Sequence, residues 1–283
     1  MPELPEVETI CNSLKSNVRG SIIKEVGVKT KKLRYKIQTR YIKEILNNRI
    51  QSIIRRGKYI LFFLSGNFVL LFHMGMSGSF SISDLCSQRK KHDHILFTLE
   101  NLKRKKKVLA FNDPRKFGCF IIVRKEKISC HRLLHHLGLE PLDDQFNGEA
   151  LFNILKDTHS LVKSTLMNQN KIVGIGNIYA CEALFDAGIS PQRDAANISI
   201  HEAKKLTASI KKILTKAIKS GGSSLVNYKN VDGKMGYFQS KFSVYKREGE
   251  DCKICSKKDT KNSKIIRLKI LGRSTYFCPT CQL

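Results

Sequence analysis

Two pairs of cysteines near the end of the sequence restrict the possible fold more than any other feature. Cys252 and Cys255 form one Cys-x-x-Cys pair, and Cys278 and Cys281 form a second pair after 22 intervening residues. Each pair supplies two thiolates from a tight turn, and four thiolates complete the tetrahedral coordination of Zn²⁺. The spacing is slightly longer than in the usual four-cysteine template. We therefore predict a zinc-binding module in which a hairpin, broken at Gly272, connects the two pairs.

The predicted zinc ion is structural, because four protein ligands leave no coordination position for the water molecule that a catalytic zinc needs. A redox function of the two Cys-x-x-Cys pairs is the alternative. The sequence has nine cysteines, and those outside the two pairs are scattered along it. A disulfide framework is therefore not expected.

Short apolar segments rich in β-branched and aromatic residues dominate the region from about residue 21 to residue 123. Turn residues such as Ser65-Gly66-Asn67 separate them. Many short strands with close turns indicate a β-sandwich or a barrel. The expected strands are Ile50–Ile54, Tyr59–Leu64, Phe68–His73, Ile95–Leu99, Val108–Phe111 and Cys119–Val123.

The periodicity becomes helical between about residues 133 and 220. Leu206 and Ile210 share the apolar face of a helix whose other faces carry lysines. Ser199 and Glu202 have the spacing of a capping box before this helix, and Gly221 is expected to end it. Together with the strands, this region predicts an α+β chain of about two domains and a small third module.

The segment Gly174-Ile175-Gly176 does not complete a dinucleotide-binding fingerprint, because Tyr179 stands where the third glycine is needed. We therefore expect no nucleotide cofactor. The segment instead predicts a tight turn before a helix that begins at Asn177, where free backbone amides can meet a phosphate.

The charge of the chain points to an anionic partner. Lys and Arg number 51 against 24 Asp and Glu, which gives a formal net charge of +27. Nucleic acid is the leading class of partner, while an anionic membrane surface, an acidic partner or a plain composition bias remain alternatives. The apolar stretches are too short to span a bilayer. The first ten residues carry three glutamates and no basic residue, unlike a secretory signal, so we expect a cytosolic protein.

Pro2 follows Met1, and a small residue at this position normally allows removal of the initiator methionine. The exposed secondary amine would be a nucleophile that forms an iminium with an aldehyde-like carbon. The acidic residues Glu3 and Glu6, with Pro5, suit the first turn of a helix. The alternative interpretation is that these residues only begin a helix.

Motifs along the whole chain resemble those of the formamidopyrimidine-DNA glycosylase family, bacterial enzymes that remove oxidised purines such as 8-oxoguanine. They occur in the family's order. They are Met1-Pro-Glu-Leu-Pro-Glu-Val-Glu-Thr9, Arg55-Arg-Gly-Lys-Tyr59, His73-Met-Gly-Met-Ser-Gly-Ser79, Lys91-His-Asp-His94, Asn112-Asp-Pro-Arg-Lys-Phe-Gly118, Gly174-Ile-Gly-Asn-Ile-Tyr-Ala180, Asp232-Gly-Lys-Met-Gly-Tyr-Phe238 and the four cysteines.

The resemblance implies an N-terminal β-sandwich with an N-terminal helix, a helix–two-turn–helix domain and a C-terminal β-hairpin zinc finger. We expect the catalytic sandwich domain over residues 1–130. The helical DNA-binding domain, with a loop that covers the damaged base, is expected over residues 131–235. The zinc finger is expected over residues 236–283.

The resemblance also implies the chemistry. Pro2 would attack C1′ of the damaged nucleotide as its base departs, and Glu3 would act as acid and base around the opening sugar ring. Lys58 matches the family lysine that assists elimination at the lesion. Arg273, near the hairpin tip, joins this catalytic set by clamping one phosphate. Successive β- and δ-eliminations would then leave a one-nucleotide gap.

The remaining matched residues are implied to bind DNA. Met76, Arg115 and Phe117 would fill the space that the extruded nucleotide vacates. Phosphate contacts are expected from His92, Lys163 and Asn177. His159 stands where family members commonly have a lysine, and its shorter side chain weakens that DNA contact.

Two alternatives stay open: an endonuclease VIII-like glycosylase for oxidised pyrimidines, and a non-catalytic zinc-containing DNA-binding protein. Leu4 and the string from Asp113 to Phe117 favour the purine-lesion enzyme. We thus expect a monomer with one structural Zn²⁺ that acts on damaged double-stranded DNA in the bacterial cytoplasm, associated with the nucleoid through DNA.

Overall fold

The computed structural model describes residues 1–223, 236–257 and 263–283. The chain divides into two compact units. The first comprises Met1–His135 with Ser220–Tyr237, and the second comprises His136–Lys219 with Phe238–Leu283. We call them the N-terminal unit and the C-terminal unit.

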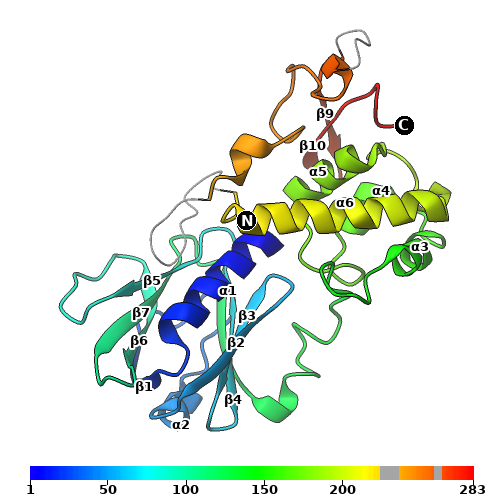
Figure 1. The fold of residues 1–283 in the computed structure, drawn as a ribbon. Helices are drawn as coiled ribbons and strands as arrows, with labels where there is room; N and C mark the ends of the chain where they lie inside the picture. Colours follow the sequence, from blue (N-terminus) through cyan, green and yellow to red (C-terminus); the bar gives the residue numbers. More distant parts are fainter. Residues whose placement is uncertain (224–235, 258–262) are drawn as a thin grey trace. The chain divides into compact units, whose positions relative to one another are not determined.

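The N-terminal unit contains two four-stranded antiparallel sheets, with strand orders β1-β6-β7-β5 and β2-β3-β4-β8. The predicted β-sandwich is therefore confirmed, and Figure 1 shows its strands beside the first helix. The elements of this unit are α1 (Leu4–Val18), β1 (Ile22–Val28), α2 (Ile42–Ile45), β2 (Ile50–Arg56), β3 (Tyr59–Leu64), β4 (Phe68–His73), β5 (Ser79–Ser83), β6 (Asp93–Glu100), β7 (Lys106–Asn112) and β8 (Cys119–Arg124).

The core of this unit lies between the two sheets and helix α1. Phe72 is fully buried at its centre, and its ring contacts those of Phe62, Phe97 and Phe120 at centroid distances of 5.4, 6.2 and 4.9 Å. Helix α1 packs against β2 and β3 (Figure 1). Its buried positions recur at helical spacing, as a half-buried helix requires.

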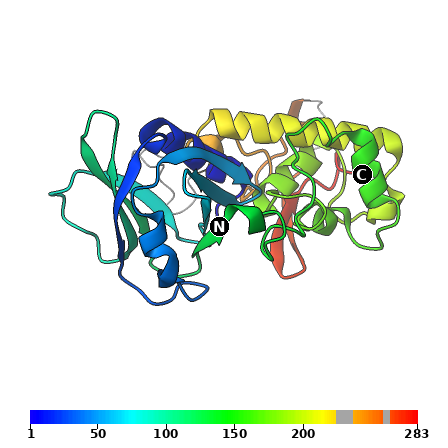
Figure 2. The ribbon, with the colours of Figure 1, turned by 90° about the horizontal axis from the view of Figure 1, so that it is seen from below.

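The C-terminal unit begins with helices. Helix α6 packs against both α3 and α5, and Figure 2 shows it running along this group. The predicted capping box is present, because the Ser199 amide donates to Glu202 over 2.9 Å and the Glu202 amide donates back to the Ser199 hydroxyl over 3.3 Å. Gly221 follows the helix with a φ of 75°. The helices are α3 (Gly148–Leu155), α4 (Val162–Leu166), α5 (Asn177–Ala187) and α6 (Ile200–Lys219).

The expected hairpin between the cysteine pairs consists of β9 (Ile266–Ile270) and β10 (Arg273–Phe277). Leu271 and Gly272 form its turn with φ values of 47° and 73°. Within the described residues, the further segments Thr39–Tyr41, Lys125–Lys127, Ala195–Asn197, Phe238–Lys241 and Cys255–Lys257 are 3₁₀ helices.

The structure groups the three predicted domains differently. The four-cysteine module belongs to the same compact unit as the helices, because buried Glu182 of α5 accepts hydrogen bonds from the amides of Ser243, Val244 and Tyr245. Residues 220–223, expected within the helical domain, and residues 236–237, expected within the zinc finger, belong to the N-terminal unit instead. Most of the expected loop over the damaged base lies outside the described residues.

None of the helices in the described ranges combines the length and the hydropathy needed to cross a membrane.

Candidate active site and nucleic-acid interface

Several of the predicted site residues lie at one end of the strands of the β2-β3-β4-β8 sheet. The antiparallel register pairs Tyr59 of β3 with His73 of β4, and His73 with Cys119 of β8. Strand β3 therefore begins where β4 ends and where β8 begins. Three connections consequently leave the sheet at this same end of the strands. They are the turn that carries Lys58, the loop after β4 and the loop before β8.

A buried carboxylate joins the loop after β4 to the loop before β8. Asp113 is 0% exposed, and its Oδ1 accepts a hydrogen bond from the Ser77 hydroxyl over 2.5 Å. Its Oδ2 accepts from the backbone amide of Gly118 over 2.7 Å. The loops also touch directly, because a Cβ atom at Gly75 would lie 2.4 Å from the Phe117 carbonyl carbon. The motif around Asp113 was identified in the sequence, but the function of Asp113 in joining the two loops was not predicted.

The tips of these loops expose the three residues expected to fill the vacated space. Met76 and Phe117 are each 48% exposed, although a large apolar side chain is more often buried. The guanidinium carbon of Arg115 lies 4.8 Å from the centroid of the Phe117 ring. The arrangement thus presents two apolar side chains and one cation, which suits insertion into a base step and contact with an unpaired base.

The N-terminal helix begins with a reciprocal capping arrangement. The backbone amide of Glu3 donates to Oε2 of Glu6 over 2.9 Å, and the Glu3 side chain accepts from the Glu6 amide. The other oxygen of Glu6 accepts from the amide and the hydroxyl of Ser223 over 2.8 and 3.0 Å. One buried carboxylate therefore fixes the first residues of the chain and the segment that follows Gly221. The function of Glu6 was missed at the level of sequence, since Ser223 lies far along the chain.

A second contact fixes the start of α1 relative to Lys58. Arg55 of β2 pairs with Glu8 of α1 at 2.6 Å, and its guanidinium also donates to the carbonyl of Gly57 over 3.3 Å. Gly57 directly precedes Lys58, whose side chain is 7% exposed. These contacts tie the first turns of α1 to the turn that carries Lys58.

His73, between Lys58 and the Met76 loop, is held neutral. Burial first, and then the positive charges of Lys58 and Arg34, lower its pKa from 6.5 to about 4. Its Nδ1 accepts a hydrogen bond from the amide of Gly75 over 2.9 Å, so protonation at this atom would break a contact that shapes the loop. The proton of the neutral ring therefore resides on Nε2.

This pKa shift predicts a loss of stability in mild acid. The unfolded chain binds the His73 proton below about pH 6.5 and the folded chain only near pH 4, so stability falls as the pH drops between these values. We expect His73 to contribute a loss of about 1.4 kcal/mol at pH 5.5. Urea unfolding at pH 7.5 and pH 5.5 measures it, with His73→Gln as the control that lacks this titration. Equal pH dependence in the two proteins would contradict the assignment.

His92 belongs to the same unit as these loops. Its backbone carbonyl accepts from the amide of Asp113 over 3.1 Å, and its side chain is half-buried. The neighbouring Asp93 accepts from the Lys90 amide over 2.9 Å and from the Asn112 amide group over 2.8 Å. These bonds hold the His92 segment beside the Asp113 loop, while phosphate contact by His92 remains a prediction.

The C-terminal unit brings three further predicted residues together. The Lys163 ammonium donates to Oδ1 of Asn177 over 2.5 Å and to the hydroxyl of Thr275 over 2.7 Å. The amide of Asn177 donates to the carbonyl of Ser274 over 2.8 Å. Both residues thus bind strand β10 directly after Arg273, which is exposed.

Lys163 is buried, whereas Arg273 is exposed. The Lys163 side chain is only 1% exposed, although it was expected to contact a phosphate. In this position it braces Asn177 and Thr275 from within, and direct phosphate contact remains a prediction. His159, four residues earlier, is exposed.

The four cysteines form a site that fits zinc. Their sulfur atoms all lie within 4.8 Å of one another, and none of the four forms a disulfide. The Cys252–Cys281 and Cys255–Cys278 sulfur distances are both 3.7 Å. A ZnS₄ tetrahedron with Zn–S bonds of about 2.3 Å has sulfur–sulfur edges of about 3.8 Å. One structural Zn²⁺ therefore matches this cluster, and its position beside β9 and β10 would fix the hairpin that carries Arg273.

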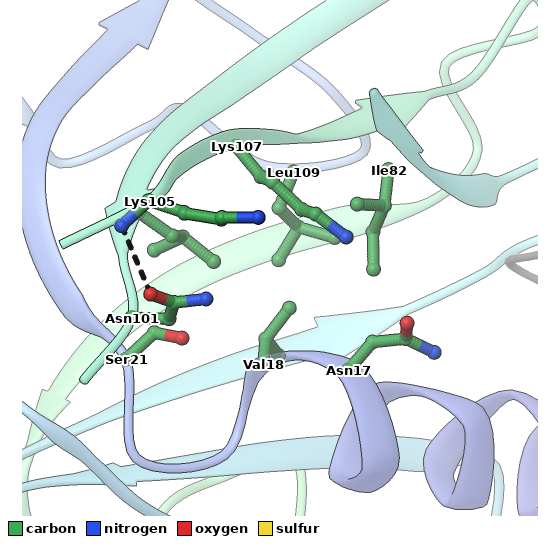
Figure 3. A pocket seen from close by; sticks show the side chains of 9 residues that line it. Asn17, Val18, Ser21, Ile82, Asn101, Lys105, Lys107 and Leu109 are labelled. Atoms are coloured by element: carbon green, nitrogen blue, oxygen red, sulfur yellow. Dashed lines mark hydrogen bonds between the residues drawn. The ribbon is translucent and has the colours of Figure 1, made fainter. Parts of the chain in front are cut away.

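The basic run Lys103–Lys107 is exposed, as expected. The side chain of Asn101 orders its turn by accepting hydrogen bonds from the amides of Lys103 and Lys105 over 2.9 and 3.0 Å. Lys105 and Lys107 also border a cavity of about 40 Å³ beside the last turn of α1, shown in Figure 3. This volume suits a few water molecules rather than a nucleotide.

Comparison with known proteins agrees with this geometry. The model of the formamidopyrimidine-DNA glycosylase N-terminal domain matches residues 1–120, and the model of the H2TH domain of the same enzymes matches residues 137–229. A formamidopyrimidine-DNA glycosylase of Wolbachia pipientis is 42% identical over 283 residues, covering 100% of both chains. One from Ruegeria pomeroyi is 40% identical over 290 residues, again covering 100% of both.

Solved structures extend the similarity to the fold. A variant of the Lactococcus lactis enzyme, in complex with DNA containing Fapy-dG, superposes with a TM-score of 0.88 at 32% identity and covers 99% of each chain. The wild-type Lactococcus lactis enzyme, in complex with DNA containing an oxidised pyrimidine, gives a TM-score of 0.87 at 31% identity over 99% of each chain. The chain belongs to the formamidopyrimidine-DNA glycosylase family.

Proposed function

We propose that this DNA glycosylase and abasic-site lyase excises oxidised purines through the amine of Pro2, exposed once Met1 is removed. The amine nitrogen forms a bond to C1′ of the damaged nucleotide, and the glycosidic electron pair leaves with the base. Opening of the sugar ring then gives an iminium between Pro2 and C1′. Glu3 moves the protons that these steps require, as a carboxylate held beside the amine by the helix cap can do.

The observation that carries this proposal is the fixed start of the chain. Glu3 and Glu6 cap the helix reciprocally, and the Arg55–Glu8 pair holds its first turns beside the turn of Lys58. Both capping carboxylates, Glu3 and Glu6, are buried. We assign Lys58 to the elimination steps because it matches the family lysine and its turn is tied to helix α1 through Arg55.

The DNA contacts divide between the two units. We propose that Met76, Arg115 and Phe117 occupy the base step opened by extrusion of the damaged nucleotide, and that His92 contacts a phosphate nearby. Arg273 and Asn177 bind backbone phosphates from the C-terminal unit, with Lys163 beneath them. His159 adds a weaker contact at the surface. The zinc ion acts only through the hairpin that it holds.

The substrate is oxidised purine in duplex DNA, and the protein acts as a monomer in the bacterial cytoplasm, at the nucleoid. The bacterial relatives and the Fapy-dG complex of the Lactococcus lactis enzyme support the substrate class and the bacterial origin. The three-domain division over residues 1–130, 131–235 and 236–283 remains our functional description, with the second and third domains packed as one unit.

A comparison of damaged duplexes tests the substrate class. We expect incision of 8-oxoguanine and formamidopyrimidine duplexes to exceed that of a thymine-glycol duplex at equal enzyme concentration. Oxidised pyrimidine is a second candidate substrate, because a Lactococcus lactis complex holds DNA with such a lesion. Faster incision of thymine glycol than of both purine lesions would favour the endonuclease VIII-like alternative. Binding of all three without incision would favour the non-catalytic alternative.

A further inference from the structure

A second basic surface of the N-terminal unit lies outside the residues assigned to the lesion. It is a groove of about 530 Å³ with Tyr35, Lys36, Arg40, His131 and Arg132 among its walls, and we call it the Tyr35 groove. None of the described residues that line it carries a carboxylate. An anion entering the groove would therefore meet several cations and no opposing charge.

The Tyr35 ring organises two of the positive groups. The guanidinium carbon of Arg132 lies 4.8 Å from the ring centroid, and that of Arg34 lies 5.7 Å from it. These arginines come from segments far apart in the sequence. The ring thus restrains the guanidinium of Arg132, in the groove wall, and that of Arg34, which lowers the entropy lost when either group binds an oxyanion.

The ring is itself firmly anchored. Tyr35 packs against the buried cluster of Leu71, Cys119, Ile121 and Val123, on the face of the sheet that also receives Leu133 and Leu134. The turn around it is closed by a hydrogen bond from the amide of Ile37 to the carbonyl of Lys31 over 3.1 Å. The groove is therefore built on a sheet rather than on a loose surface loop.

His131 adds no positive charge to the groove at neutral pH. Burial first, and then the charges of Arg132 and His135, lower the pKa of His131. The positive charge of the groove wall is therefore that of Lys36, Arg40 and Arg132. The groove thus resembles the phosphate-binding surfaces of nucleic-acid-binding proteins more than a dispersed solvated surface.

The groove adjoins the loop that carries Arg115 and Phe117. The amide of Arg34 donates to the carbonyl of Gly118 over 2.9 Å, and the ammonium of Lys116 donates to the hydroxyl of Thr30 over 3.4 Å. The segment bearing Arg34 and Tyr35 therefore lies next to the loop that is proposed to meet the opened base step.

We propose that the Tyr35 groove binds phosphates of the DNA backbone outside the damaged step, and so extends the contact of the N-terminal unit along the duplex. The proposal rests on the proposed function, since it needs the loop of Phe117 to meet DNA. Lys36, Arg40 and Arg132 are its cationic contacts. It recognises no base, and its contribution is sequence-independent affinity that falls with salt.

The test compares two variants with equal loss of charge. Lys36→Gln/Arg40→Gln/Arg132→Gln changes the groove, and Lys103→Gln/Lys105→Gln/Lys107→Gln changes the exposed run elsewhere in the same unit. Dissociation constants for an abasic-analogue duplex are measured between 0.05 and about 0.3 M salt. Each phosphate contact contributes about 0.9 to the slope of log K against log salt, so the groove variant should lose up to about 2.7. Its affinity should fall about fivefold per contact at 0.15 M salt.

Methylphosphonate substitution locates the contacts. Neutralising single phosphates stepwise away from the lesion should weaken binding of the wild-type protein at one or more positions where the groove variant is insensitive. Equal slopes for the groove variant and the Lys103–Lys107 control, or the same sensitive positions in wild type and groove variant, would overturn the proposal. Borohydride trapping of the wild-type protein, measured in parallel, decides the proposed function separately. Trapping with unchanged groove slopes defeats the groove alone, whereas absent trapping defeats the catalytic assignment.

Discussion

Borohydride will trap a covalent complex between the mature protein and 8-oxoguanine DNA, and retention of Met1 will abolish it. The hydride reduces the iminium between Pro2 and C1′ to a stable amine. With Met1 in place the Pro2 nitrogen lies in an amide bond, whose lone pair is delocalised and not nucleophilic. We therefore expect the trapped band and strand incision to fall to background in the Met1-retaining protein.

A removable extension supplies the matched control. A protein carrying an N-terminal tag should neither trap nor incise, and protease cleavage that leaves Pro2 as the first residue should restore both. Because the same polypeptide is tested before and after cleavage, a folding defect cannot account for the difference. DNA binding by the tagged protein should persist, since the contacts of Met76, Arg115 and Phe117 do not use the amine.

Lys58 is the rival nucleophile, because it carries a primary amine and its turn is tied to helix α1 through Arg55. Tryptic digestion separates the two, since the first basic residue of the chain is Lys15 and the peptide from Pro2 to Lys15 does not contain Lys58. We expect the reduced sugar adduct on that N-terminal peptide. An adduct on a Lys58 peptide, with trapping that survives retention of Met1, would overturn the assignment of Pro2.

The strands that were predicted to the residue are those whose burial is nearly continuous. Strand β3 over Tyr59–Leu64 and β4 over Phe68–His73 were predicted to the residue, because both are central in their sheet and nearly all their side chains are apolar. Strands β1 and β5 were missed. Both lie at the edges of the other sheet, and β5 alternates serines with apolar residues. Whether such a segment forms a strand depends on its pairing with a neighbouring strand, and the local composition does not show which segment that neighbour is.

The residues of the candidate site were also predicted only in part. Met76 and Phe117 stand close in sequence to the glycines and proline of Gly75-Met-Ser-Gly78 and Asp113-Pro114, which are typical of exposed loops. The buried carboxylate of Asp113 could not be predicted as the tie between their loops, because it reaches Ser77 across 36 positions of sequence. The burial of Lys163 depends on Thr275, 112 positions away. Motifs thus located the residues that meet the DNA, whereas the residues that hold them depend on long-range contacts.

Removal of zinc has the second large expected effect, although the metal touches no substrate. Structural zinc supplies folding free energy of about 10 kcal/mol or more in small modules, so its loss should release the hairpin of β9 and β10. The bonds from Lys163 and Asn177 to β10 would lose their partners, and Arg273 would lose its fixed position. We expect the zinc-free protein to show no DNA binding at concentrations that saturate the holoprotein.

Two variants separate the metal from the arginine and from cysteine chemistry in general. Arg273→Gln keeps the zinc and removes one charged phosphate contact, which should cost about 1.5–3 kcal/mol, or about 10- to 150-fold in affinity. Cys130→Ser changes an exposed cysteine outside the cluster and should leave zinc content and binding unchanged. Cys278→Ser should lose both zinc and binding, and by more than Arg273→Gln, because every contact of the hairpin fails together. Zinc-free protein that binds damaged duplex with the affinity of the holoprotein would show that the hairpin holds its shape without the metal, and the structural function assigned to the four cysteines would then be wrong.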